Sequence, residues 1–130
     1  MSDIIILDTD ILVDVARGVT APLEYIKKAK DKYQLCIGAV TEMELIIGCR
    51  NKVELMQLDR FLSDYLHLRI TPEISDKSVE LIRRFRLSHG LLIPDAIIAA
   101  TAIVTGHPLL TNNQKHYQYI PEIELADTLI

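Results

Sequence analysis

The chain has 130 residues, which is enough to bury one hydrophobic core and too few for separate cofactor and substrate domains. Apolar residues make up 49% of the sequence and charged residues 25%, a balance that excludes a disordered chain. Eighteen acids against fourteen bases give a net charge of −4, which excludes a uniformly basic nucleic-acid coat protein. We therefore expect a single globular domain over residues 1–130.

The first residues and the cysteines predict a cytoplasmic protein. Residues 1–7 contain no basic segment and only four consecutive apolar residues before an acid, so we expect no signal peptide. No apolar run approaches the length of a bilayer span, and we expect no association with a membrane. Cys36 and Cys49 match no zinc or redox spacing, so both are expected to be reduced, packed side chains.

In the first half of the chain, the apolar pattern predicts strands that alternate with helices. Residues 4–7 form a continuous apolar run typical of a buried strand, and residues 11–16 continue as a helix that stops near Gly18. A second helix over residues 22–33 precedes a short strand at 35–38. A third helix begins at Thr41.

The second half continues this alternation. Residues 58–66 keep a helical spacing and precede a possible strand at 68–70. Thr71 and Pro72 begin a helix that ends at Gly90, and Pro94 starts a helix whose residues 96–104 are apolar almost all round. Two short strands are expected at 109–110 and 123–125. The order predicts an α/β sandwich with a mostly parallel central sheet flanked by helices, whose strand ends meet at one crevice.

Several common chemistries are excluded by missing motifs. The five glycines are too scattered for a dinucleotide-binding or phosphate-binding loop, and no serine stands in a nucleophile elbow. The four histidines are not paired with each other or with a cysteine at metal-ligand spacing. Among them, only His116 is kept as a candidate for the site.

Acidic residues stand where the predicted strands give way to helices. Asp8 and Asp10 close the first strand, Glu44 follows the second, and Asp95 opens the most apolar helix. Helix capping explains some of them, because Thr41 and Glu44 have the spacing of a capping box and Asp10 and Asp95 stand in first helical turns. Asp8 does not fit this explanation, because it ends an apolar strand where a carboxylate needs a cation or several donors.

If the sheet brings Asp8, Glu44 and Asp95 together, a cation is needed to offset their repulsion. Oxygen ligands without cysteine or paired histidine select Mg²⁺ or Mn²⁺. A hard cation held in this way orients a phosphate and activates a water, as in metal-dependent nucleases. The acids therefore predict a metal site for phosphoester chemistry.

Four segments surround these acids in order: LDTDIL at 7–12, VTEMELIIG at 40–48, PDAIIAATA at 94–102 and LLTNNQKHY at 109–117. In these segments the chain resembles the PIN-domain family, and within it the VapC-like ribonuclease toxins of prokaryotic toxin–antitoxin systems. The resemblance implies a PIN-like fold, endonucleolytic cleavage of RNA with Mg²⁺ or Mn²⁺, a homodimer and a cognate antitoxin that silences the enzyme. It places Asp8, Glu44 and Asp95 on the metal-binding acids of the family.

The resemblance departs from the family pattern at two places. Thr9 and Asp10 fall on a usual Thr-Asn pair, and Asn113 falls on a position that is commonly a fourth acid. A neutral Asn113 leaves a carbonyl oxygen for phosphate or a metal ligand water, and Asp10 partly compensates for the missing charge. The basic runs at 27–32 and 83–86 fit either RNA phosphate contacts or ordinary solvated helix faces.

The sequence thus predicts a metal-dependent endoribonuclease with Asp8, Glu44, Asp95 and Asn113 in catalysis, the three acids holding the metal. One alternative is a haloacid-dehalogenase-like phosphatase with Asp8 as nucleophile and Asp10 as acid/base. That chemistry also needs a downstream lysine and a late acidic pair, whereas Asp95 stands alone. The other alternative is a non-catalytic PIN-like binding domain, in whose favour Asn113 is neutral.

Overall fold

The computed structural model describes residues 3–126, in which parallel strands form one central sheet. The strands are β1 (Ile4–Leu7), β2 (Gln34–Gly38), β3 (Leu66–Leu68) and β4 (Leu109–Leu110), in the spatial order β3-β2-β1-β4. Ile5 pairs with Leu35 of β2, and Ile6 pairs with Leu109 of β4, so β1 is an interior strand. The predicted parallel sheet is confirmed. Residues 1–2 and 127–130 of the predicted single domain lie outside the described residues.

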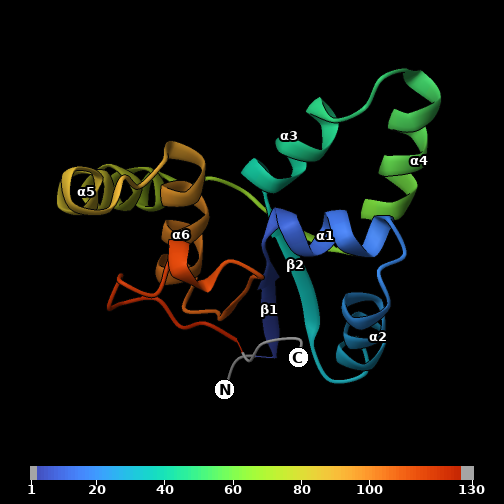
Figure 1. The fold of residues 1–130 in the computed structure, drawn as a ribbon, viewed down its shortest axis with the longest axis horizontal. Coiled ribbons are helices and arrows are strands. Elements are labelled where there is room, and N and C mark those ends of the chain that lie inside the picture. Colours follow the sequence, from blue (N-terminus) through green and yellow to red (C-terminus); the bar gives the residue numbers. More distant parts are fainter. Residues whose placement is uncertain (1–2, 127–130) are drawn as a thin grey trace.

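Helices flank the sheet, and a short 3-10 helix, η1, follows β4 (Figure 1). Within residues 3–126, no helix has the length and apolar content that a membrane crossing requires. The helices in chain order are α1 (Thr9–Ala16), α2 (Thr20–Ala29), α3 (Ala39–Ile47), α4 (Lys52–Leu62), α5 (Pro72–His89), α6 (Ile93–Thr105) and η1 (Gln114–His116).

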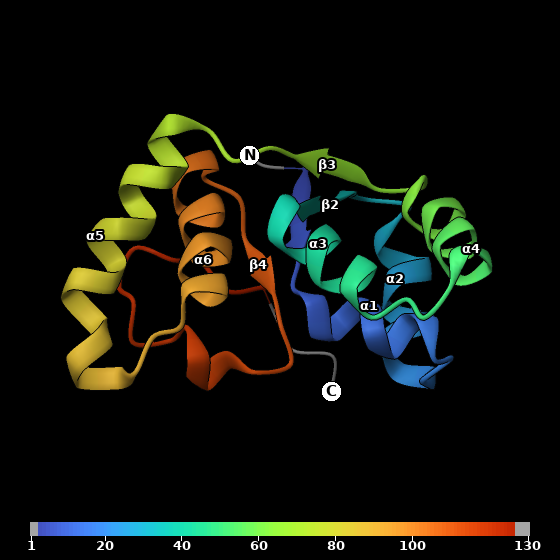
Figure 2. The same cartoon turned by 90° about the horizontal axis from the view of Figure 1, so that it is seen from above.

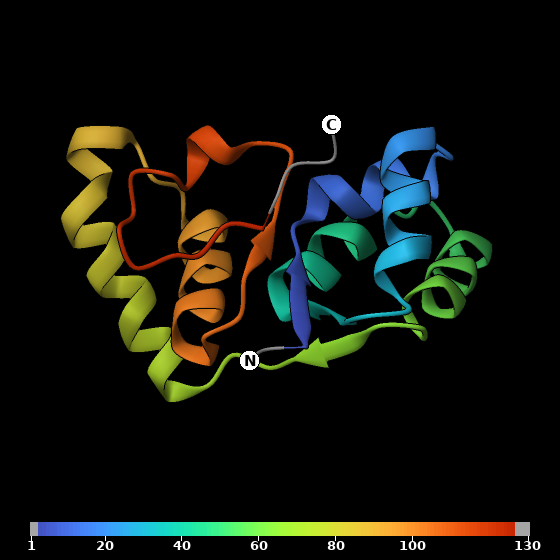
Figure 3. The ribbon, with the colours of Figure 1, turned by 90° about the horizontal axis from the view of Figure 1, so that it is seen from below.

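Alternate residues of the strands enter two hydrophobic cores. Ile6 and Leu109 join the core that contains α5 and α6, whereas Ile5 and Leu7 join the core that contains α1 and α2. Figures 2 and 3 show α5 and α6 on one side of the strands and α1, α2 and α4 on the other. Because both faces of β1 are buried, its sequence is apolar at every position, as predicted.

The predicted start and end of α5 are confirmed. The Thr71 hydroxyl accepts a hydrogen bond of 3.2 Å from the amide of Ile74 at the start of α5. Gly90 and Gly106 follow α5 and α6 with φ of 70° and 73°, a left-handed conformation that favours glycine. The short turn after Gly90 brings the chain straight into the first turn of α6.

Two predicted helix boundaries are wrong in the first half of the chain. The second helix spans Thr20–Ala29 rather than residues 22–33, and Pro22 stands inside its first turn, where no amide donor is needed. The third helix begins at Ala39 rather than Thr41, directly after Gly38 at the end of β2. Gly38 is the N-cap and offers no side chain, so no sequence motif announces this start.

Two further boundaries differ in the second half. Helix α4 ends at Leu62, so Tyr65 is buried from a turn rather than from a helix face. The third strand covers Leu66–Leu68 rather than residues 68–70. The expected strand at 123–125 is reduced to one parallel bridge between Leu109 and Leu125.

Candidate active site

The predicted site residues lie after strands or near the starts of helices, and Asp95 stands where α6 follows α5 rather than a strand. Asp8 follows β1 directly, Glu44 belongs to α3 beyond β2, and Asp95 stands in the first turn of α6. Asn113 comes between β4 and η1. Because β2, β1 and β4 are parallel neighbours, the segments that leave their carboxyl ends start from the same edge of the sheet.

Asp8 is the most buried of these acids, with 7% of its surface exposed. Its Oδ1 accepts a hydrogen bond of 2.8 Å from the amide of Thr9, which makes Asp8 the N-cap of α1. Its Oδ2 accepts from the hydroxyls of Thr111 at 2.8 Å and Tyr117 at 3.1 Å. The expectation that Asp8 has no capping role is therefore wrong, since a helix start and two hydroxyls compensate its burial.

Tyr117 connects two of the acids from a fully buried position. Its hydroxyl lies 3.1 Å from Asp8 Oδ2 and 3.3 Å from Asp95 Oδ1. Burial, followed by the charges of Asp8 and Asp95, raises the pKa of Tyr117 far above its ordinary value. Tyr117 therefore stays protonated at neutral pH and donates its one proton to one of the two carboxylates at a time.

Asp95 is half-buried, and the charges of both other predicted metal ligands affect its pKa. Its pKa is raised, mainly by burial and then by the charge of Asp8, with a smaller contribution from Glu44. His116 and the Tyr117 hydroxyl act in the opposite direction, and His116 Nδ1 lies 3.9 Å from Asp95 Oδ2. The charges of Asp8 and Glu44 thus both act on the carboxyl group of Asp95.

Glu44 is exposed and held by Thr9. The Thr9 hydroxyl donates a hydrogen bond of 2.6 Å to Glu44 Oε1 and lies 3.1 Å from the hydroxyl of Thr41. The capping-box interpretation of Thr41 and Glu44 is wrong, because α3 begins at Ala39 and Thr41 is buried inside its first turn. The amide of Thr9 meets Asp8 while its hydroxyl meets Glu44, so one residue fixes two acids.

Asp10 lies close enough to Asp8 to be affected by its charge, and it contacts the segment after β4. Its Oδ2 accepts from the backbone amide of Asn112 at 3.1 Å and from the side-chain amide of Asn113 at 3.0 Å. Its Oδ1 is buried and has no hydrogen-bond partner among the described residues. Burial first, and then the charge of Asp8, raise the pKa of Asp10 to about 6. Asn113 thus contacts the site through its nitrogen, which donates to Asp10.

Sequence reasoning missed Thr111 and Tyr117. Both lie in the segment 109–117 that resembles the family, and Thr111 is a buried polar residue directly after β4. A polar side chain at the buried end of an apolar strand was the available signal. Nothing in the local sequence distinguishes Tyr117 from a tyrosine that only fills the core.

The predicted basic runs are used partly within the fold. Arg84 pairs with Glu122 at 2.7 Å, and Arg86 donates to the carbonyl of Gly90 at 3.0 Å. In the earlier run, Lys30 lies 3.8 Å from a carboxylate oxygen of Asp64. These contacts favour the interpretation of the runs as ordinary helix faces.

A hard divalent cation fits the acids by two observations. Asp10 Oδ1 is a buried oxygen without a donor among the described residues. Burial, followed by the charge of Asp8, raises the pKa of Asp95, so a bound cation would offset the cost of its negative charge. All the available ligands are oxygens, which suit Mg²⁺ or Mn²⁺. Among residues 3–126, no three His, Cys, Asp or Glu side chains form a metal-binding group by themselves. Mg²⁺ commonly takes only one or two carboxylates and keeps several waters.

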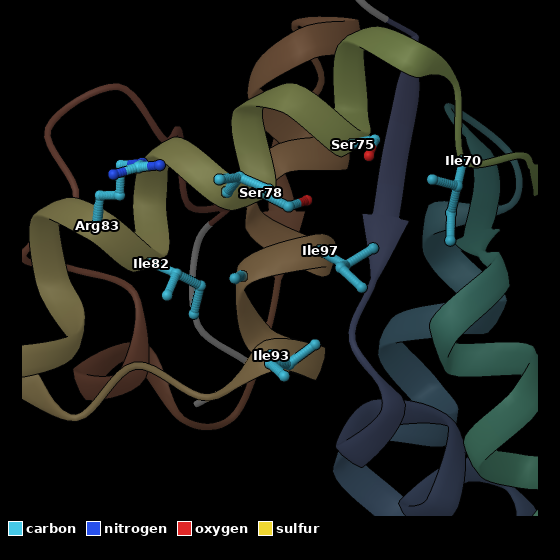
Figure 4. Close-up of a pocket in the computed structure, with 9 residues that line it drawn as sticks. Ile70, Ser75, Ser78, Ile82, Arg83, Ile93 and Ile97 are labelled. Carbon is cyan, nitrogen blue, oxygen red and sulfur yellow. The ribbon is translucent and has the colours of Figure 1, made fainter.

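An apolar hollow lies away from these acids, between α5 and α6. It has a volume of 470 Å³, and Ile82, Ile93 and Ile97 point into it together with Ser78 (Figure 4). Arg83 is its single charged lining residue among those that the structure describes. The acid cluster, rather than this apolar groove, carries the groups needed for catalysis.

Comparisons with known proteins identify the family. A PIN domain family model matches residues 5–120, and the chain belongs to this family. Ribonuclease VapC19 of Mycobacterium tuberculosis is 33% identical over 121 residues, which cover 92% of this chain and 96% of that protein. The predicted family and fold are confirmed.

Two solved structures extend the comparison. The chain is similar to a structure of VapBC2 from Rickettsia felis bound to a DNA fragment from their promoter, with a TM-score of 0.81 and 25% identity over 95% of this chain and 97% of that chain. It is also similar to a toxin–antitoxin complex from Klebsiella pneumoniae, with a TM-score of 0.74 and 30% identity over 96% and 97%.

Proposed function

We propose that this protein is a Mg²⁺- or Mn²⁺-dependent endoribonuclease and the toxin of a toxin–antitoxin pair. One observation carries the proposal: Thr9 and Tyr117 connect Asp8, Glu44 and Asp95 in a continuous hydrogen-bonded network. The family and the ribonuclease name of a relative at 33% identity support the same activity. Neither a phosphatase nor a non-catalytic domain gains support from these comparisons.

In this proposal, Asp8, Glu44 and Asp95 hold the cation. A cation bound there would supply a water activated for attack on the phosphodiester and would compensate the charge of the phosphate. Thr111 and Tyr117 occupy Asp8 Oδ2, while the Thr9 amide contacts Oδ1, so the orientation of this carboxylate is fixed before any ligand arrives. Asn113 holds Asp10 in place beside Asp8.

Cleavage of RNA by purified protein tests the proposal. The wild type is expected to cut RNA only with Mg²⁺ or Mn²⁺, and both Asp8→Asn and Asp95→Asn to abolish cutting, because a hard cation requires the carboxylate charge. Asp59→Asn, which removes an exposed acid of α4, is the control and should cut normally. Undiminished cleavage by both site variants, or by the wild type in excess chelator, would contradict the mechanism.

Two further measurements distinguish the proposed nuclease from a phosphatase and from a non-catalytic domain. A generic phosphomonoester should stay intact with Mn²⁺, whereas its hydrolysis would favour a phosphatase that uses Asp8 and Asp10. RNA that is bound but uncut in every metal would favour a non-catalytic domain.

We propose that this protein is a single domain and that it works in the cytoplasm. We also propose that its protein partners are a cognate antitoxin and a second copy of this chain. The similar structures include a toxin–antitoxin complex, which supports the first partner. We expect the antitoxin to be a small protein encoded beside this chain, and adding it should abolish RNA cleavage. Cleavage that continues in its molar excess would show that it is not the antitoxin.

A further inference from the structure

A cavity of 190 Å³ adjoins Asp95 and is distinct from the apolar groove between α5 and α6. One wall comes from the end of α5 and the turn that follows it, with His89 and Leu92. The other comes from η1 and the residues after it, with Lys115, His116 and Tyr119. Asp95 belongs to both the cavity and the acid cluster, so the cavity opens beside the proposed reaction centre.

The cavity contains a rigid aromatic surface. The rings of His89 and Tyr119 are stacked, with centroids 4.0 Å apart and planes within 6° of parallel. Phe85 meets the Tyr119 ring edge-on at 5.1 Å, and the Ser88 hydroxyl lies 2.8 Å from His89 Nδ1. His89 is nevertheless exposed at the end of α5. An exposed ring that is already fixed loses little conformational freedom when a further planar group stacks on it.

Two basic side chains, Lys115 and His116, also line the cavity. His116 approaches Asp95 Oδ2 at 3.9 Å, and within residues 3–126 Lys115 takes part in no ion pair. A positive group near the acid cluster favours the phosphate that flanks a docked nucleotide, while the aromatic surface favours its base.

We propose that this cavity is a subsite for one unpaired RNA base next to the phosphate that is cut. The proposal rests on the proposed endoribonuclease function. The volume equals about six water molecules, which is room for one planar ring system but not for a base pair. Bases of an A-form helix remain stacked and cannot enter, so the subsite selects single-stranded RNA or a loop.

Binding of labelled single-stranded RNA, measured by fluorescence anisotropy in chelator, tests the subsite without any cleavage. His89→Ala should weaken binding about tenfold, within the range measured for the loss of one base–aromatic stack. His89→Phe keeps a planar ring and should restore binding. Leu87→Ala is the control, because Leu87 is fully exposed on the same helix and does not line the cavity. Equal binding by the wild type and His89→Ala overturns the proposal.

A series of RNAs, each with one base removed, locates the docked base. His89→Ala should have no further effect on the RNA that lacks this base, whereas it should weaken binding of the other RNAs. The same loss on every RNA of the series overturns the proposal. A wild type that binds in this position-dependent way but cuts no RNA would refute the nuclease function and leave the base subsite standing.

Discussion

At the scale of single residues, the hydroxyl of Tyr117 is the point where two of the proposed metal ligands meet. Its ring is buried in the core that contains α5 and α6, and its oxygen faces the acids. Loss of a group that orients a metal ligand typically lowers metal affinity about 10- to 100-fold. Tyr117 is thus a positioning residue of the proposed site.

We expect Tyr117→Phe to weaken Mn²⁺ binding about 10- to 100-fold, because Asp95 Oδ1 loses its donor while the ring packing is kept. The metal-free variant should also melt a few degrees lower, since removing one hydrogen-bond partner costs about 1–3 kcal/mol. Calorimetric titration with Mn²⁺ and melting curves measure both effects. Tyr33→Phe, on an exposed tyrosine, is the matched control. Unchanged Mn²⁺ affinity in Tyr117→Phe would show that the hydroxyl has no positioning role.

Asp10 makes the stability of the metal-free protein depend on pH. Its pKa of about 6 in the folded state exceeds the ordinary value of 3.8, so the folded protein binds the extra proton between these values. Stability from this group is present at low pH and is lost as pH rises through about 6. Asp10→Asn keeps an acceptor for Asn113 and removes the charge, so it should remove this loss of stability at higher pH.

We therefore expect Asp10→Asn to stabilise the metal-free protein at neutral pH and to have little effect near pH 4. The gain is on the order of 1 kcal/mol after allowance for solvent screening of a half-exposed carboxyl. Melting curves of the wild type and the variant across this pH range measure it, with Asp59→Asn as the control. A difference that stays constant with pH would rule out Asp10 as its source.

The sequence predicted the acids of the site but not the groups that hold them. The pattern of acids beside apolar runs predicts all three, and the shared edge of the parallel strands explains the positions of Asp8 and Glu44. Asp95 follows α5 rather than a strand, so its position depends on how α6 packs. The hydrogen bonds from Thr111 and Tyr117 to Asp8 span 103 and 109 positions. Such pairs are fixed by the packing of β4 and η1 and leave no local pattern.

At the scale of elements, helix periodicity located most helices but not all of their ends. The start of α3 was misplaced because Thr41 and Glu44 have the spacing of a capping box, whereas the chain turns into the helix directly after Gly38. This difference changes the role of Glu44 from a possible cap to a residue of the second turn. It leaves the Thr9 hydroxyl as the contact that holds its carboxylate.

Glu44→Gln tests this placement. In this variant the amide oxygen can still accept the hydrogen bond from Thr9, and no helix cap is lost. One of three clustered negative charges is removed, so the metal-free variant should melt at the wild-type temperature or above it. Added Mg²⁺ should stabilise the variant less than the wild type, and RNA cleavage should fall. Melting curves with and without Mg²⁺ beside a cleavage assay measure these effects. Full activity with an unchanged Mg²⁺ response would exclude Glu44 from the metal site.

At the scale of the whole molecule, apolar side chains remain uncovered on the surface. Ile93 is 69% exposed and lines the groove between α5 and α6, and Leu92 beside it is 55% exposed. A contiguous apolar surface of this kind is typical of an interface. We expect a homodimer, with about twice the monomer mass in light scattering at micromolar concentration.

Ile93→Asp tests which surface forms this dimer. A charge in the groove should shift the protein to the monomer if α5 and α6 meet their counterparts there. Ile47→Asp is the matched control, because Ile47 is 82% exposed on α3 and does not line the groove. A wild type of monomer mass would contradict the dimer, and a dimer that persists in Ile93→Asp would place the interface elsewhere.

The pairing of β1 with β4 also determines when the site is completed during synthesis of the chain. Asp8 is made before the strand beside β1 and the hydroxyls that hold Asp8, which come from residues 109–117. A ribosome that adds about 5–20 residues per second makes those groups about 5–20 seconds after Asp8. A chain that has not reached residue 117 carries Asp8, Glu44 and Asp95 without these supports, so the site is completed only after that segment has been made and packed.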